Sequence, residues 1–163
     1  KANLPSITLL RVYGELMEKN PEYQTRYSQL LDALGKSETR DPLVEAALGR
    51  LALRGDAGAE AAVEHLSRAV ELGFSAPETY ADLAEAQARA GRETDAVATL
   101  QRGIALAPYA PVLHKSLALR YIHLKQYGEA RKTLEQYVEL FPEDDFMRGL
   151  LLKARGAADP QRR

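Results

Sequence analysis

Two adjacent stretches of the chain repeat one another over 34 residues, and this repeat constrains the fold more than any other feature of the sequence. Residues 77–110 and 111–144 align without a gap. The paired positions at which the same residue recurs include Leu83 and Leu117, Ala84 and Ala118, Ala96 and Ala130, Leu100 and Leu134, Leu106 and Leu140, Pro108 and Pro142. A period between about 20 and 50 residues is typical of arrays in which each unit buries its apolar face against the next.

Each unit has the pattern of two helices joined by a turn. In the unit at residues 77–110, the apolar side of the first helix is expected to comprise Tyr80, Leu83, Ala84 and Gln87. This spacing of i, i+3, i+4, i+7 indicates an amphipathic helix. Pro77 and Pro111 suit the first turn of a helix, whereas Pro108 and Pro142 cannot continue one. The pattern therefore predicts two helices per unit.

Together these residues resemble the tetratricopeptide repeat, a helix–turn–helix unit of 34 residues. Repeat 77–110 matches the family pattern at Tyr80, Leu83, Ala84, Ala96, Leu100, Gly103 and Pro108. Repeat 111–144 matches it at Leu117, Ala118, Tyr121, Ala130, Leu134 and Pro142. The resemblance implies an all-α fold, a right-handed superhelical solenoid of antiparallel helix pairs with a C-terminal capping helix.

The rest of the chain fits the same scheme with fewer matches. Residues 42–76 form a third copy, and residues 7–41 are either a degenerate fourth copy or an ordinary helical hairpin. We therefore predict a single array over residues 1–157, with a disordered tail at 158–163.

An open array needs a helix that covers its last apolar face. Residues 145–157 are predicted to form this capping helix. The side chains expected to lie against the last repeat are Phe146, Leu150, Leu151 and Ala154.

Composition excludes several kinds of chemistry and partner. The chain has no cysteine, so it has no thiolate metal ligand and no Cys nucleophile. Its 22 Lys+Arg and 23 Asp+Glu leave a net charge of −1, which gives no overall attraction to nucleic acid or an anionic membrane. No apolar run reaches the roughly 18 residues of a membrane span. These features predict a soluble protein, cytoplasmic or periplasmic, without a nucleic-acid or membrane partner.

The three histidines predict neither a metal site nor a catalytic site. His114 and His123 are nine residues apart on one predicted helix, which places them on opposite faces at about 100° per residue. We expect His114 in the core and His65 on the surface. No phosphate-binding, dinucleotide-binding, metalloprotease or nucleophile-elbow motif occurs. The sequence therefore predicts no catalytic residue, no metal, no cofactor and no enzyme activity.

The resemblance also implies where a partner would bind. In tetratricopeptide-repeat proteins the first helices of successive repeats line a concave groove. The matching positions in this sequence predict a partner-binding set of Arg50, Arg54, Glu85, Arg89, Lys115, Leu119, Ile122 and His123. The first unit would add Thr8, Arg11, Glu15, Glu18 and Lys19. The cations would suit a ligand with an acidic group, and the apolar residues an aliphatic side chain. The alternative is that the arginines only keep the solenoid soluble.

Some members of the family bind a chaperone's C-terminal carboxylate through a clamp of Lys, Asn and Arg. Here the corresponding position of successive units holds Glu15, Arg50, Glu85 and Leu119, so the clamp is not expected. The implied function is a non-catalytic scaffold that binds a peptide segment or folded partner in the concave groove. Two alternatives stay open: a self-association module, or an appendage that positions another domain of a larger protein.

Overall fold

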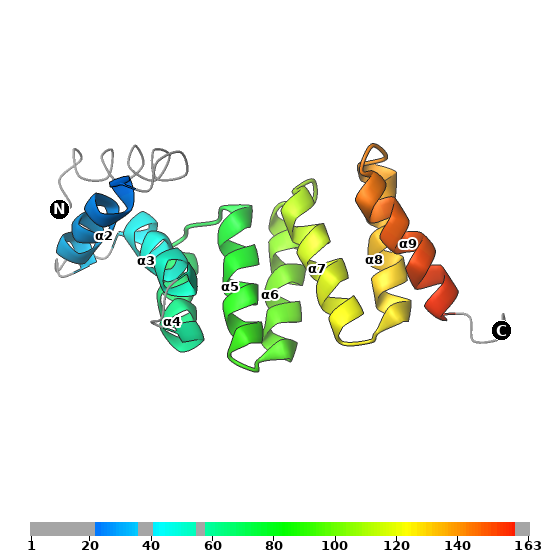
Figure 1. Cartoon of the computed structure of the whole chain (residues 1–163), viewed down its shortest axis with the longest axis horizontal. Coiled ribbons are helices and arrows are strands. Elements are labelled where there is room, and N and C mark those ends of the chain that lie inside the picture. Colours follow the sequence, from blue (N-terminus) through cyan, green and yellow to red (C-terminus); the bar gives the residue numbers. More distant parts are fainter. Residues whose placement is uncertain (1–21, 36–40, 55–57, 159–163) are drawn as a thin grey trace.

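A computed structural model describes residues 22–35, 41–54 and 58–158, which form eight α-helices and no strand (Figure 1). The helices are α2 (Glu22–Gly35), α3 (Pro42–Arg54), α4 (Gly58–Glu71), α5 (Pro77–Arg89), α6 (Glu93–Leu106), α7 (Pro111–His123), α8 (Tyr127–Leu140) and α9 (Asp145–Ala158). The predicted all-α fold is confirmed. The first half of the degenerate repeat and residues 159–163 of the predicted tail lie outside the described residues.

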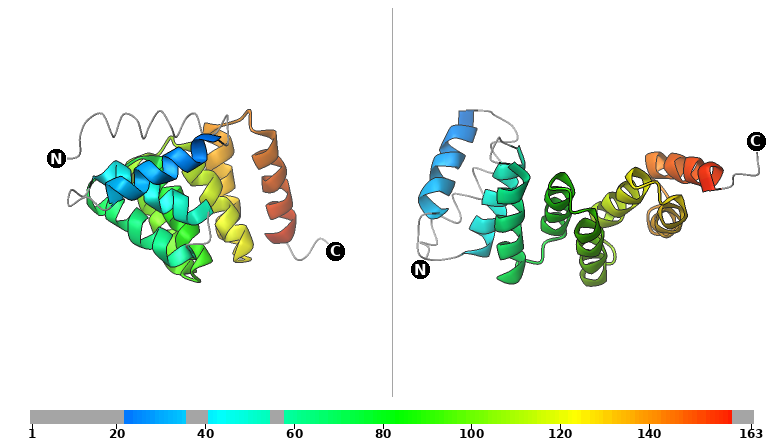
Figure 2. Two further views of the ribbon diagram at one scale, coloured as in Figure 1. Left: turned by 60° about the vertical axis from the view of Figure 1, so that its left-hand side comes forward. Right: turned by 90° about the horizontal axis from the view of Figure 1, so that it is seen from below.

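Consecutive helices form pairs, and the pairs stack in chain order. α3 packs on α4, α5 on α6 and α7 on α8, and each pair also contacts the next. Figures 1 and 2 show the resulting open solenoid, with α2 at one end and α9 at the other. The first helices of successive pairs touch directly, α3 with α5 and α5 with α7. We call α3, α5 and α7 the inner helices.

The prolines and turn residues of the repeat lie at the helix boundaries that the sequence predicts. Pro77 and Pro111 each lie in the first turn of a helix. The turn between α5 and α6 needs a left-handed residue, which is Gly91 with φ of +77°. One period later, Lys125 adopts the same conformation with φ of 59° between α7 and α8. The 34-residue repeat therefore preserves the turn geometry even where glycine, which suits it best, is absent.

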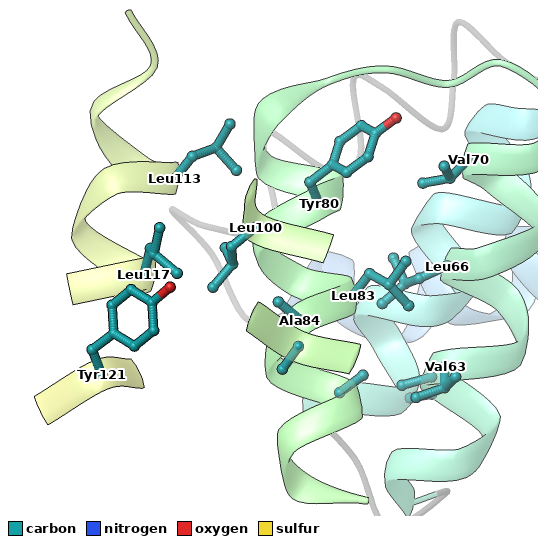
Figure 3. Packing of buried hydrophobic residues seen from close by; sticks show 14 of the residues in the cluster. Val63, Leu66, Val70, Tyr80, Leu83, Ala84, Leu100, Leu113, Leu117 and Tyr121 are labelled. Carbon is teal, nitrogen blue, oxygen red and sulfur yellow. The ribbon is translucent and has the colours of Figure 1, made fainter. Parts of the chain in front are cut away.

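The main core runs through the stacked pairs. Figure 3 shows Leu113 and Leu117 of α7 beside Leu100 of α6, and Leu66 of α4 beside Leu83 of α5. All five side chains are at most 6% exposed. Burying a leucine side chain contributes roughly 1.5–3 kcal/mol, so contacts between successive units hold the array together.

The aromatic positions of the repeat are also buried. Tyr80 and Tyr121 are 3% and 7% exposed, and His114 is 5% exposed, as predicted. His114 Nε2 lies 2.8 Å from the Pro108 carbonyl oxygen. The prediction for His65 was wrong, because this residue is half-buried with Nδ1 2.8 Å from Glu45 Oε2.

Helix α9 covers the last repeat, but with a different residue from the one expected. Phe146 is 67% exposed, so its predicted burial is wrong, and Met147 is fully buried instead. The reason is the helix phase: α9 begins at Asp145, and Asp144 accepts a hydrogen bond from the Met147 backbone N–H at 3.1 Å. Met147, Leu151 and Ala154 consequently face the repeat.

Candidate functional site

The predicted partner-binding residues lie on the three inner helices. We call the place where α3 meets α5 the first gap and the place where α5 meets α7 the second gap. The residues predicted from the first unit, Thr8 to Lys19, lie outside the described residues. The other eight fall into five groups with different surroundings.

Arg50 and Arg54 of α3 face the first gap. Their positive charges act on the carboxylate of Asp82 of α5 and lower its pKa, whereas the nearby carboxylates of Glu78 and Glu85 raise it. Burial has the larger effect, so the pKa of Asp82 is raised overall. Within the described ranges neither arginine forms an ion pair as short as 4.0 Å. The first gap therefore has two guanidinium groups and the three carboxylates of Asp82, Glu78 and Glu85 beside it.

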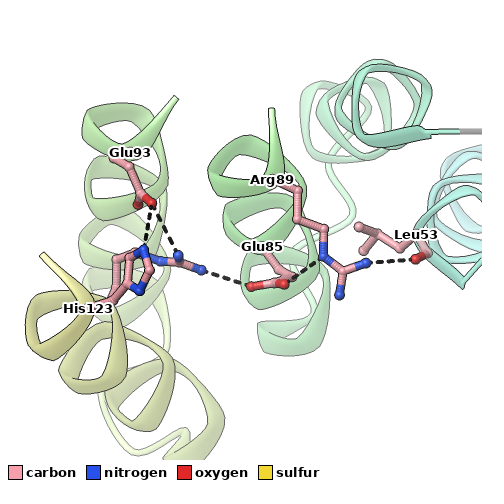
Figure 4. A network of polar contacts seen from close by, with 6 residues as sticks. Leu53, Glu85, Arg89, Glu93 and His123 are labelled. Carbon is pink, nitrogen blue, oxygen red and sulfur yellow. Dashed lines mark hydrogen bonds and ion pairs between the residues drawn. The ribbon is translucent and has the colours of Figure 1, made fainter. Parts of the chain in front are cut away.

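Arg89 belongs to a chain of polar contacts that crosses the inner surface (Figure 4). Its guanidinium donates to the Leu53 carbonyl oxygen at 3.0 Å and to Glu85 Oε1 at 2.7 Å. Arg120 of α7 donates to the other oxygen of Glu85 at 2.8 Å and to Glu93 Oε1 at 3.5 Å. These bonds connect α3, α5, α6 and α7 across the surface.

The second gap contains a cavity of about 260 Å³. Its lining combines apolar and polar side chains from α5, α6 and α7: Ala81, Ala84, Glu85, Leu100, Ser116, Leu119, Arg120 and His123. Leu119 is 46% exposed, and the side chain of His123 is 71% exposed with Nε2 3.8 Å from Glu93 Oε1. The structure thus brings Glu85, Leu119 and His123 together around one cavity.

Lys115 lies in a separate cluster. Its ammonium nitrogen is 2.6 Å from Asp144 Oδ2, just before α9, and 5.6 Å from the centre of the Tyr137 ring. The hydrogen bond to Asp144 raises the pKa of Lys115 and is the main reason that the pKa of Asp144 falls to about 2. Burial raises the pKa of Tyr137. Lys115 therefore ties α7 to the end of the array.

Ile122 is half-buried and packs against both the main core and the cluster under α9. Its contacts are thus mainly structural. No group of three His, Cys, Asp or Glu side chains that could ligate a metal occurs among the residues the structure describes. None of the described helices has the length and hydropathy to cross a membrane.

Sequence reasoning missed Asp82, Glu93 and Arg120. Glu85 and Arg120 are 35 residues apart, and Leu53 and Arg89 are 36 apart, so each contact joins residues about one repeat period apart. Opposite charges separated by one period were therefore the available signal for contacts between neighbouring inner helices.

Comparison with known proteins supports the repeat. Residues 116–144 match the family model of the tetratricopeptide repeat. No curated protein matches the sequence at a significant level.

Solved structures share the fold along most of the chain. The APC/C hetero-tetramer Cut9-Hcn1 is similar with a TM-score of 0.76 and 23% identity over 93% of this chain, which spans only 29% of that one. The MamA RS-1 double mutant has a TM-score of 0.75 and 18% identity, covering 95% of this chain and 86% of its own. The first tetratricopeptide-repeat domain of Spaghetti (RPAP3), bound to an HSP90 peptide, has a TM-score of 0.64 and 19% identity. The match covers 72% of this chain and 92% of that one.

Proposed function

Since this chain has the tetratricopeptide-repeat fold, we propose that it is a binding module that holds an extended peptide segment of a partner protein across α3, α5 and α7. The observation that carries the proposal is that two guanidinium groups without a close ion pair, those of Arg50 and Arg54, lie one helix away from a cavity. The module would act through binding alone, with no chemical step.

The first gap suits an acidic group of the ligand. Asp82 also has the carboxylates of Glu78 and Glu85 nearby, but Arg50 and Arg54 form no ion pair as short as 4.0 Å within the described ranges, so both guanidinium groups can pair with a ligand carboxylate. Arg89 is already engaged by Glu85 and the Leu53 carbonyl, which makes Arg50 and Arg54 the better candidates for direct contact.

The second gap suits an aliphatic side chain. Ala81, Ala84 and Leu119 supply apolar walls for the cavity, and the ion pair of Glu85 with Arg120 borders them. Because this ion pair is already formed, the cavity needs little ordering when a ligand enters.

Helix spacing sets the spacing of the two ligand residues. Packed helices lie about 8–10 Å apart, and an extended peptide advances about 3.3–3.6 Å per residue. The acidic and aliphatic residues of the ligand should therefore be about three positions apart.

The test starts from a displayed library of random peptides of about 12 residues, which span about 40 Å when extended. We expect the selected peptides to share an acidic residue about three positions from an aliphatic one. Affinity, measured by fluorescence polarisation, should fall with added salt, because the pairing of exposed charges is screened.

The decisive variant is Arg50→Glu/Arg54→Glu. Its control is Arg131→Glu/Lys132→Glu, which changes the net charge by the same amount on α8, the second helix of its pair and not an inner helix. Circular dichroism should first show that both variants are folded. The Arg50→Glu/Arg54→Glu variant should then bind the peptide at least about tenfold more weakly, and the Arg131→Glu/Lys132→Glu variant should bind it as the unchanged chain does. Equal affinities for both variants would place the binding site outside the inner surface.

A further inference from the structure

Helix α9 occupies the place of an inner helix in the repeat register. Asp145 lies 34 residues after Pro111, so Met147 and Leu151 of α9 correspond to Leu113 and Leu117 of α7. All four are buried, at no more than 7% exposure. Figure 1 shows α9 following α8 along the array as α7 follows α6. The same 34-residue register shows which faces of α7 correspond to the two exposed faces of α9.

One face of α9 corresponds to the face of α7 that packs on α8. In α7 this face has the buried residues His114, Ala118 and Tyr121. In α9 the same positions are exposed and hold Arg148, Leu152 and Arg155.

The side chains of this face suit the end of an array. Arg148 pairs with Asp145, and Arg155 lies 3.1 Å from Glu135. Leu152 is also too large for the close approach that Ala118 permits. A charged outer face of this kind terminates an array in water.

The other exposed face of α9 corresponds to the inner surface. Phe146, Gly149 and Lys153 stand one period after Val112, Lys115 and Leu119. Phe146 is 67% exposed, and a Cβ added at Gly149 would have no atom within 4 Å. A large apolar side chain thus stands beside open space, on the face that continues the proposed binding surface.

The geometry points to α9 as a fourth helix of the binding surface, where Phe146 contacts an apolar side chain of the same peptide. This inference rests on the proposed function and deepens it. Helix α9 packs on α8, and Ala118 of α7 belongs to the buried cluster under it. With one helix spacing of about 8–10 Å from α7 to α9, the space between these two helices lies two spacings from the first gap. At about 3.3–3.6 Å per residue, the ligand would carry an apolar residue five or six positions from its acidic one.

The experiment uses a peptide selected from the random library and a copy of it with that distal apolar residue changed to serine. Both are measured against the whole chain and two variants, Phe146→Ser and Leu152→Ser. The two residues are matched in exposure, 67% and 69%, but Leu152 is on the charged end face. Melting curves of both variants should coincide with that of the unchanged chain.

We expect Phe146→Ser to weaken binding of the selected peptide about tenfold, and binding of the serine copy by less than twofold. Leu152→Ser should change neither affinity. An unchanged affinity of Phe146→Ser, with loss in Arg50→Glu/Arg54→Glu, would overturn this inference and leave the proposed function standing. Equal losses in both serine variants would also overturn it, in favour of contact at the end of the array. If Arg50→Glu/Arg54→Glu binds every selected peptide with unchanged affinity, the proposed function itself is overturned.

Discussion

At the scale of single residues, Asp144 connects three helices through one carboxylate. Its Oδ2 accepts a hydrogen bond from the Tyr137 hydroxyl at 2.9 Å and lies 2.6 Å from the Lys115 ammonium. Its Oδ1 accepts the Met147 backbone N–H, which caps the start of α9. These contacts favour the charged carboxylate and lower its pKa from 3.8 to about 2.

This pKa predicts a defined pH window for the stability of the folded chain. Because the pKa is lower in the folded state, the ionised carboxylate stabilises the fold fully above about pH 4, and its contribution is lost as the pH falls toward about 2. Asp144→Asn keeps a capping side chain but removes the charge. The variant should therefore unfold more easily in urea at neutral pH, and the difference should close between about pH 4 and 2.

Asp145→Asn is the matched control at the same helix end. The side chain of Asp145 is 83% exposed and pairs only with Arg148 among the described residues, so its loss should change stability little. A difference between Asp144→Asn and the unchanged chain that stays constant from neutral to acid pH would contradict the role assigned to this carboxylate.

At the scale of elements, the close approach of α3 and α4 depends on Gly49. A Cβ at this position would lie 2.4 Å from Cγ of Leu66 and 3.1 Å from the Leu66 backbone nitrogen. Gly49→Ala would thus push the helices apart, at about 1–3 kcal/mol for overpacking, against about 1 kcal/mol gained from helix propensity. We expect a net loss of up to about 2 kcal/mol in the free energy of unfolding, measured with urea.

The same substitution at Gly149 should raise the stability of the chain instead of lowering it. Gly149 lies inside α9 with open space where its Cβ would be, so alanine there should stabilise the chain by about 0.5–1 kcal/mol. A destabilising Gly149→Ala would show that the space beside α9 is filled in solution.

The elements themselves were predictable, because helix formation follows from local spacing and the 34-residue period. The tetratricopeptide-repeat resemblance is confirmed, as is burial of Tyr80 and Tyr121. Phe146 was mispredicted because it stands one residue before the buried Met147, and one residue turns a side chain by about 100° around the helix. The bond between Glu85 and Arg120 depends on the rotamers of two long side chains in different units, which the apolar pattern does not encode.

At the scale of the whole molecule, the core is divided along the array. The main cluster extends from Ala52 of α3 to Ala130 of α8, and a second cluster joins α7, α8 and α9. A third joins α2 and α3 through Leu31, Val44 and Ala47. Since each unit contacts only its neighbours, damage at one end should be felt locally rather than throughout the array.

Leu151→Ala tests this local response. Leu151 of α9 is 7% exposed and packs in the second cluster, so its truncation should cost about 2–3 kcal/mol. Hydrogen exchange measured by mass spectrometry should show faster exchange in α8 and α9, with α3 and α4 unchanged. Leu152→Ala, next in the chain and 69% exposed, should leave exchange unchanged throughout.

The pattern of exchange decides between two descriptions of the array. If α9 opens as a separate unit, protection falls only where the second cluster lies, and the inner surface from α3 to α7 keeps its geometry. If the chain unfolds as one cooperative body, Leu151→Ala lowers protection equally from α3 to α9. The first result would mean that a ligand touching both α5 and α9 also stabilises α9, because binding to the closed array opposes its opening.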